Sequence, residues 1–266
     1  MGAIITDTLK RQFLDKLYNE VSMLDSHNYS VGIGHHEQWD SSDTVPDLVG
    51  APKEELTAKI GLQSVKTVTD IIYTVPRYNW SSGTIYQAYD DAVKGATGNG
   101  FYVLTDLNEV YVCVQQGKNA QGAAQTSTVK PSYSTAGVAV TKAFQTSDGY
   151  VWKMLYTLSA SNANKFLTSN YLPVPPRATG LGSPDATQAE QQTIEAAATA
   201  GQVLNIVMTN EGSGYGSDPT ITIDGDGVLC TASPTRDGNQ IKKIELDSSA
   251  DSGVAMGHNF KLASVS

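Results

Sequence analysis

Cysteine is scarce in this sequence, which excludes a fold held together by disulfides. Only 2 of the 266 residues are cysteine, Cys113 and Cys230, and both have apolar neighbours. A cysteine in apolar surroundings is typical of a small core residue. Because a chain of this length buries a substantial core without cross-links, we expect a globular protein that folds in a reducing cytoplasm.

Positive charge is also in short supply. Lys and Arg number 18 against 27 Asp and Glu, which gives a formal net charge of -9. Binding to nucleic acid requires clustered Lys and Arg that neutralise phosphates. The basic pair Lys242-Lys243 lies within alternating apolar residues and fits solvent-facing positions of a strand. We therefore expect no nucleic-acid partner.

Long hydrophobic runs are missing as well. No apolar run reaches the roughly 18 to 20 residues that cross a bilayer, and the N-terminal segment lacks the apolar centre of a signal peptide. Residues 1–6 match a myristoylation pattern, but no polybasic segment or second lipid site follows to make the anchor stable. We expect no membrane anchoring.

Histidine is rare, and the one histidine cluster has poor spacing for a metal. Of 4 histidines, two stand in His35-His36-Glu37, where all three side chains are able to bind metal ions. Adjacent residues of an extended chain point to opposite sides, and a helical zinc site needs ligands four residues apart. The pattern favours exposed loop residues and leaves metal binding at His35 and His36 open.

Motifs for catalysis are absent. There is no Gly-x-Ser-x-Gly nucleophile elbow, and neither cysteine has the electropositive neighbours of a reactive thiol. Asp224-Gly225-Asp226-Gly227 resembles the start of a calcium loop, but it lacks a glutamate at the twelfth position and follows a strand. A β-turn between strands explains it better. We expect no enzyme, no cofactor and no small-molecule substrate.

What the sequence does contain is typical of a β-rich protein. Apolar residues three to four apart from Leu9 to Leu24 predict an N-terminal amphipathic helix, and Pro52 begins a second short helix that runs to about Gly61. Alternating and β-branched segments predict strands. These segments are 29–34, 65–73, 101–114 as a hairpin, 150–158 and 220–223. Two further helices are expected, at 159–168 with Ser159 or Ser161 as cap, and from the cap Ser183 to Ala200.

The resulting fold class is mainly β with a few short helices (α+β), and composition divides the chain into three parts. Residues 1–175 form a β-sandwich core with the N-terminal helix. Residues 176–200 form a Pro/Gly-rich connector and helix. Residues 201–266 form a small β module with a weak internal repeat, in which the pattern of 201–215 returns about 38 residues later.

Three short stretches carry a specific pattern of aromatic and small residues. They are Val31-Gly32-Ile33-Gly34-His35-His36-Glu37-Gln38-Trp39, Val75-Pro76-Arg77-Tyr78-Asn79-Trp80 and Ser147-Asp148-Gly149-Tyr150-Val151-Trp152-Lys153-Met154-Leu155-Tyr156. In order and approximate spacing they resemble the baseplate wedge subunit encoded by gene eight in T-even-type contractile-tailed bacteriophages, including relatives from cyanobacterial phages. The resemblance covers residues 1 to about 175.

This resemblance implies a structural virion protein. A member of the family is a β-sandwich protein that forms a homodimer within the wedge of the tail baseplate, contacts other wedge subunits and has no catalytic residues. It is made in the cytoplasm of the host bacterium and ends up in the virion. Two departures limit what is carried over: His35 stands where the family has an arginine, and residues 176–266 do not follow the T-even version.

Aromatic residues gather in and after the second stretch, and they are the candidates for a protein interface. Trp, Tyr and Arg are enriched among interface residues that dominate binding energy. The candidate residues are Arg77, Tyr78, Trp80, Tyr86, Tyr89 and Trp39. An alternative is that Trp80 and one tyrosine close the end of the β core. Both hold if Trp80 points inward while Tyr86 and Tyr89 point outward.

Two other functions remain open at this stage. A receptor- or carbohydrate-binding tail module would use the Tyr- and Gly-rich segment 209–223 to present an aromatic face to sugars. A cell-envelope hydrolase would have His35, His36, Glu37 and Asp40 as its metal or acid–base group.

Overall fold

The protein consists of two compact units, Met1–Ile72 and Tyr73–Ser266. The computed structural model describes residues 6–22, 29–34, 61–68, 70–90, 100–178, 180–198, 201–203, 206, 208, 210–247, 256–258 and 263–265. The sequence-based boundaries at residues 175 and 200 stay a prediction. The helix predicted to start at Pro52 lies outside the described residues.

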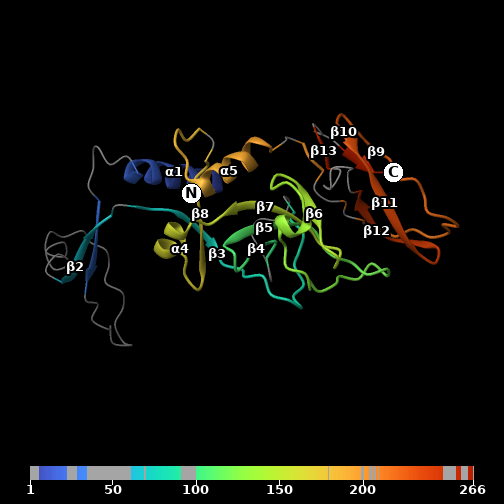
Figure 1. Ribbon diagram of the computed structural model, residues 1–266, viewed down its shortest axis with the longest axis horizontal. Coiled ribbons are helices and arrows are strands. Elements are labelled where there is room, and N and C mark those ends of the chain that lie inside the picture. The colour runs from blue at the N-terminus through green and yellow to red at the C-terminus, as the bar shows by residue number, and fades with distance from the viewer. Residues whose placement is uncertain are drawn as a thin grey trace, which may run out of the picture. The chain divides into compact units, whose positions relative to one another are not determined.

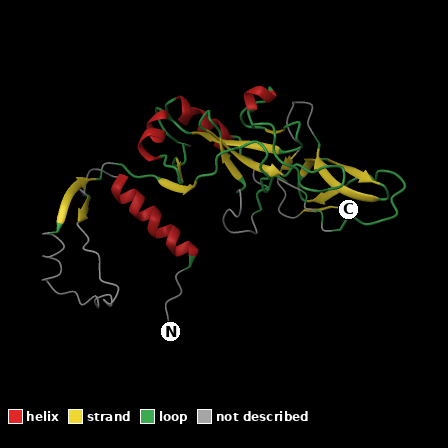
Figure 2. Ribbon diagram, turned by 90° about the horizontal axis from the view of Figure 1, so that it is seen from below, coloured by secondary structure: helices red, strands yellow, loops and turns green. Residues whose placement is uncertain are grey.

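Secondary structure confirms the predicted fold class. Strands account for 32% of the described residues and helices for 19%. Among the described residues the helices are α1 (Asp7–Ser22), α3 (Tyr133–Ala136), α4 (Ala160–Phe166) and α5 (Ala186–Ala196). Figure 2 shows how much of the chain lies in short strands joined by loops. No helix in the described ranges is both long and apolar enough to span a membrane.

The first unit contains α1 and an antiparallel pair of strands, β1 (Ser30–Gly34) and β2 (Leu62–Thr67). The helix is the one that the spacing of apolar residues predicts. The register of the pair shifts between Ile33 and Gly34. A Cβ on Gly32 would lie 2.5 Å from a methyl carbon of Leu62, so a larger residue there would force the Leu62 side chain away. A two-stranded sheet is only marginally stable without further packing.

The strand predicted at 65–73 is in fact two strands. The first, β2, pairs with β1, whereas β3 (Tyr73–Pro76) pairs with β8 (Tyr171–Val174) in the second unit. Alternation of side chains does not reveal such a change of partner, because it depends only on local backbone geometry. As predicted, β3 ends at Pro76, which has no N–H to continue the ladder.

A four-stranded antiparallel sheet forms the centre of the second unit. Its strand order is β4-β5-β7-β6, with β4 (Tyr102–Leu104), β5 (Glu109–Gln115), β6 (Ala143–Gln145) and β7 (Val151–Thr157). The predicted hairpin over 101–114 is the β4–β5 pair, and Asn108 takes a positive φ of 60° in its turn. Asparagine tolerates this conformation better than most residues.

Both faces of this sheet are buried. On one face Tyr111, Cys113, Trp152 and Met154 pack with Ile194 of α5, and α5 lies along β7 (Figure 1). Residues of the other cluster come from β4, β5, β7 and β8: Tyr102, Leu104, Val110, Tyr156, Leu158 and Leu172. Burying a large apolar side chain contributes about 1.5–3 kcal/mol. These clusters are therefore the main stabilising element of the unit.

The two short helices after β7 begin at polar caps. Ser159 caps α4, as the sequence suggests, and its hydroxyl accepts from the Asn162 N–H. The cap of α5 is Asp185 and not the predicted Ser183. The Asp185 carboxylate accepts from the Gln188 N–H, and the Gln188 side chain accepts from the Asp185 N–H, both at 2.9 Å. This reciprocal capping box satisfies two donors, which fixes the helix start at Asp185.

The C-terminal segment is built from paired strands. The longest pair is β11 (Ala232–Asp237) with β12 (Gln240–Leu246), and two shorter pairs join β10 (Val228–Cys230) to β13 (Met256–His258) and β9 (Ile223–Gly225) to β14 (Ala263–Val265). The strand predicted at 220–223 begins only at Ile223. It continues through Asp224 and Gly225, so the predicted turn at 224–227 is shorter than expected.

The β11–β12 hairpin is joined to the central sheet by packing and by one carboxylate. Ala232 and Leu246 pack with Val114, Ala143 and Val151 of the sheet. Glu245 accepts from Gln115 and from Gln145, each at 3.3 Å, and lies 2.9 Å from the Lys243 ammonium. The hairpin thus shares a core with the sheet instead of forming a core of its own.

Replacing Glu245 with alanine is expected to loosen this hairpin. The change removes the acceptor of two amide N–H groups and leaves the half-buried Lys243 without its carboxylate, which costs about 1–2 kcal/mol. Limited proteolysis should then cut within 211–247 faster than in the wild type. A Glu190→Ala variant, altered on α5, serves as the control. Equal cleavage of the hairpin in all three proteins would contradict this role of Glu245.

Candidate protein interaction surfaces

The stretch from Val75 to Trp80 turns from one sheet to the edge of another. After β3 ends, the Leu104 N–H donates to the Tyr78 carbonyl at 2.8 Å, and the Trp80 N–H donates to the Leu104 carbonyl at 2.9 Å. Asn79 therefore forms a short parallel bridge with Leu104. The Tyr102 hydroxyl donates to the Pro76 carbonyl at 2.7 Å. The segment is a corner that is fixed by hydrogen bonds to β4.

Trp80 points inward, as expected. Its indole packs against the cluster around Trp152, and its Nε1–H donates to the Ser127 hydroxyl at 3.1 Å. A tryptophan with its ring in the core and its N–H on a polar partner satisfies both halves of the side chain. Trp80 thus anchors the corner.

Tyr86 corrects the sequence-based expectation. It was predicted to point outward, but only 1% of the residue is exposed. Its ring makes edge contacts with Tyr150 and Trp152, and its hydroxyl accepts from the Ser81 N–H at 2.7 Å. Burial is favoured because the ring fills the core while the hydroxyl finds backbone partners at the rim. Tyr86 is a core residue and is therefore no longer a candidate for the interface.

The remaining candidates lie closer to the surface. Tyr89 is 36% exposed, with one ring edge against Phe101. Tyr78 is half-buried and packs edge-on against Tyr102. The Arg77 guanidinium donates to the Asn79 side chain and to the Thr168 carbonyl, both at 2.8 Å, so it also ties the corner to the loop after α4. Trp39 lies outside the described residues.

The second and third sequence stretches meet in space. The Ser127 hydroxyl, which accepts from Trp80, donates to Asp148 at 3.2 Å. The Asp148 carboxylate also accepts from the N–H groups of Thr128 and Val129 at 2.7 and 2.9 Å, and from the Thr146 hydroxyl. One carboxylate therefore holds a loop of three residues and connects it to the corner.

Tyr150 strengthens the same junction. Its ring stacks on Trp152 with 5.6 Å between centroids. Burial raises the pKa of Tyr150 to about 12, so the phenol stays protonated and donates to the Gln125 carbonyl at 2.6 Å. A Cβ on Gly117 would lie 2.5 Å from the Asp148 carbonyl oxygen, so only glycine fits beside this turn. The residues of the second and third stretches named here are thus packing and hydrogen-bonding elements of the fold.

Asp148 makes the stability of this junction depend on pH. Burial raises the pKa of Asp148, but the hydrogen bonds from Thr146, Val129 and Thr128 outweigh it and bring the pKa below the ordinary value of 3.8. The stabilisation is therefore complete above the unfolded-state pKa and is lost as the pH falls through the lower folded-state value. We expect the free energy of unfolding to fall on acidification below about pH 4, and to fall less in Asp148→Asn.

Urea denaturation of both proteins across about pH 3 to pH 6 measures this difference. The control is Asp218→Asn, which alters an exposed aspartate paired with Arg236. If the pH dependence of Asp148→Asn matched that of the wild type, the assignment of this stabilisation to Asp148 would be refuted.

An apolar surface that the motif residues did not indicate lies in the first unit. On α1 the side chains of Leu9, Phe13, Leu14 and Leu17 are exposed, and Phe13 reaches 64%. Large exposed apolar patches mark interaction sites on soluble proteins. The helical spacing of these residues was visible in the sequence, but spacing alone does not tell whether the face is covered within the chain. We call these four residues the α1 face.

The β1–β2 pair is exposed in the same way. Val31 and Ile33 of β1, together with Leu62 and Val65 of β2, are exposed large hydrophobic residues, and Ile33 reaches 63%. Every residue of both strands is exposed. A short apolar strand pair of this kind offers its exposed side chains to another protein chain.

The alternative sites are placed as follows. The cluster His35-His36-Glu37 and Asp40 lie outside the described residues. Within the described ranges, no three His, Cys, Asp or Glu side chains stand close enough to hold a metal ion together. In the segment 209–223, Tyr215 lies against Gly212, and Arg236 donates to the Tyr215 carbonyl and to Asp218. These hydrogen bonds hold the loop that contains Tyr215 and Asp218 against the β11–β12 hairpin.

Comparison with known proteins gives no further identification. No protein family model, no curated protein and no solved structure matches the chain.

Proposed function

We propose that this chain is a structural subunit of the tail baseplate wedge of a contractile-tailed bacteriophage, which assembles through protein interfaces as a homodimer and with other wedge subunits. The observation that carries the proposal is the set of exposed apolar residues in the first unit, on the α1 face and on the β1–β2 pair. The three sequence stretches that resemble the wedge family give the biological setting.

The α1 face supports an assembly role because it is costly to leave in water. Each fully buried Leu or Phe gains about 1.5–3 kcal/mol relative to an exposed one. Leu9, Phe13, Leu14 and Leu17 are all exposed, while their spacing puts them on one side of the helix. A partner that covers this side recovers that free energy.

Charges beside the α1 face favour a second copy of the same helix. At 100° per residue, Lys10 and Glu20 both fall within the arc that the apolar residues span. Lys10 lies in the first half of the helix, Glu20 lies near the end, and the last turn has no basic residue. A cation near the start of a helix and an anion near its end both interact unfavourably with the helix dipole. Within its own chain Glu20 already lies 3.8 Å from the Lys16 ammonium and accepts from the Tyr29 hydroxyl. An antiparallel partner helix brings Lys10 of each copy near Glu20 of the other, where it adds to these contacts.

The junction between the second and third sequence stretches supports the family resemblance. Trp80 and Asp148 are connected through Ser127, and the Trp80 ring packs against the cluster that contains Tyr150 and Trp152. Residues that recur in a family because they hold its fold together should contact one another in this way. The residues of the second and third stretches that carry the resemblance therefore stabilise the same part of the fold.

Measuring the mass of the purified chain in solution tests the dimer. One chain has a mass of 28.3 kDa, and light scattering at micromolar concentration should give twice this value. The value should fall on dilution, since association is governed by mass action. A mass of one chain at every concentration would refute the homodimer and leave only contacts with other proteins.

A further inference from the structure

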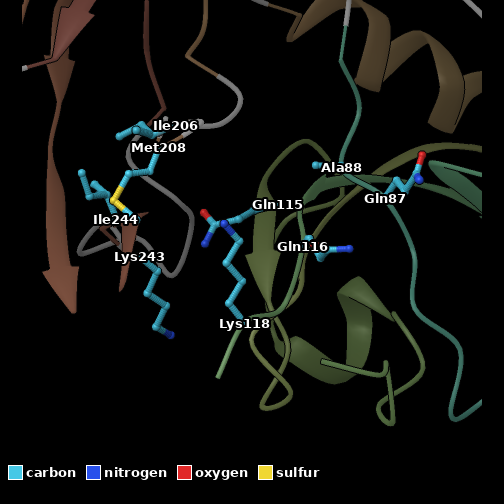
Figure 3. Close-up of a pocket in the computed structure, with 9 residues that line it drawn as sticks. All are labelled: Gln87, Ala88, Gln115, Gln116, Lys118, Ile206, Met208, Lys243 and Ile244. Carbon is cyan, nitrogen blue, oxygen red and sulfur yellow. The ribbon is translucent and has the colours of Figure 1, made fainter. Parts of the chain in front are cut away.

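A pocket lies where the end of β5 faces β12 in the second unit. Its volume is about 290 Å³, and its lining includes Gln115, Gln116 and Lys118 on one side and Lys243 and Ile244 on the other. In Figure 3 the side chains of Gln115 and Lys118 lie across from Lys243 and Ile244. The volume is at the lower end of the range for ligand sites.

The polar side of the pocket is fixed by contacts with the fold. The Gln115 amide donates to Glu245 at 3.3 Å, and the Gln116 amide donates to the Tyr86 carbonyl at 2.8 Å. Lys243 is paired with the same Glu245 at 2.9 Å. These contacts hold both glutamines and Lys243 in one arrangement before any ligand arrives, which lowers the entropy cost of binding.

Lys118 carries a positive charge that no carboxylate of the described residues neutralises. None of the residues in the described part of the chain forms an ion pair with its ammonium, and none of the lining residues is acidic. In a protein with a net charge of -9, a half-buried cation without a carboxylate is a specific attraction for an anionic group.

The opposite wall is apolar and adaptable. Ile206, Met208 and Ile244 line it, and Ile206 and Ile244 continue into the cluster that joins the β11–β12 hairpin to the sheet. Methionine has a flexible side chain that adjusts to different apolar groups. The wall therefore fits an aliphatic side chain.

We propose that this pocket binds an acidic peptide segment of another protein, in which a carboxylate pairs with Lys118 and a neighbouring aliphatic side chain packs on Ile206, Met208 and Ile244. The glutamine amides match the donors and acceptors of a peptide backbone. A phosphate site would need several donors around one point, and none of the described lining residues has an aromatic ring to stack on a sugar. The inference does not depend on the proposed function, since it rests on the pocket alone.

Nuclear magnetic resonance on the full 15N-labelled chain tests the proposal with two blocked peptides, acetyl-Leu-Glu-Leu-amide and acetyl-Leu-Gln-Leu-amide. The acidic peptide should cause saturable shifts of the amide signals at 115–118 and 243–244, with about tenfold higher affinity than the neutral peptide. Lys118→Met should remove this tenfold preference. Lys142→Met, which removes an exposed lysine elsewhere, should keep it.

Three results would overturn the proposal. They are equal affinity for the two peptides, shifts confined to other residues, and no shifts at peptide concentrations up to about 10 mM. Inorganic phosphate is titrated in parallel. If phosphate alone produced the same shifts and displaced the acidic peptide, the pocket would be a site for small anions and not for a peptide segment.

Discussion

Replacing Phe13 with lysine is expected to convert the proposed homodimer into a monomer at micromolar concentration. Phe13 is the most exposed residue of the α1 face, so a dimer that covers this face buries its ring. Lysine removes the apolar contact and places an ammonium against the Leu side chains of the partner. Losing a central interface residue costs about 2 kcal/mol or more, which weakens association at least about 30-fold. Sedimentation equilibrium measures the change.

The matched control for this variant is Asn19→Lys. It adds the same charge to the same helix, but at 100° per residue Asn19 lies about 120° around the helix from Phe13 and outside the arc that the apolar residues span. Circular dichroism of both variants checks that the fold is kept. If Phe13→Lys associated as strongly as Asn19→Lys and the wild type, the α1 face would not be the dimer interface.

Replacing Trp80 with alanine is expected to lower the free energy of unfolding by about 2–4 kcal/mol. The change leaves a cavity beside the cluster around Trp152 and removes the donor to Ser127. Ser127 in turn orients Asp148, so the loop at 127–129 also loosens. Urea denaturation of the wild type and of Trp80→Ala measures the difference between their free energies of unfolding.

Tyr89→Ala provides the comparison for Trp80→Ala. Tyr89 follows the same corner, but it is partly exposed and has one edge contact with Phe101, so its loss should cost less than about 1 kcal/mol. Similar, small losses in both variants would mean that Trp80 does not anchor the corner and that its ring is available to a partner after all.

Local signals in the sequence predicted the elements that local physics controls. The spacing from Leu9 to Leu24 predicted α1, which the structure describes from Asp7 to Ser22, and the β4–β5 hairpin followed from two β-prone runs around a polar turn. Pro76 marked the end of β3 because proline removes a ladder donor. Each of these features is decided by residues within a few positions of one another.

Features that depend on distant residues were not predictable in the same way. Tyr86 is buried because Tyr150 and Trp152, more than 60 positions away, complete the cluster around it. The contact of Glu245 with Gln115 spans 130 positions. Sequence patterns record that a residue is aromatic or charged, but tertiary packing decides which side of the chain it occupies.

The candidate interface changed for this reason. The aromatic residues around Trp80 were predicted to form a protein interface because Trp, Tyr and Arg are common in interfaces. The same residue types also hold the ends of β cores together, and the structure uses Trp80 and Tyr86 in that way. Of the candidate residues within the described ranges, Tyr78 and Tyr89 keep exposed ring surface near the corner, whereas α1 carries four exposed large apolar side chains.

The position of the chain in an assembled phage particle tests the central proposal most directly. Gold-labelled antibodies against this chain, imaged by electron microscopy on intact particles, give that position. We predict that the label forms a ring at the end of the tail where the baseplate lies. Label on the tips of fibres, or none on the particle, would contradict the assignment to the baseplate wedge.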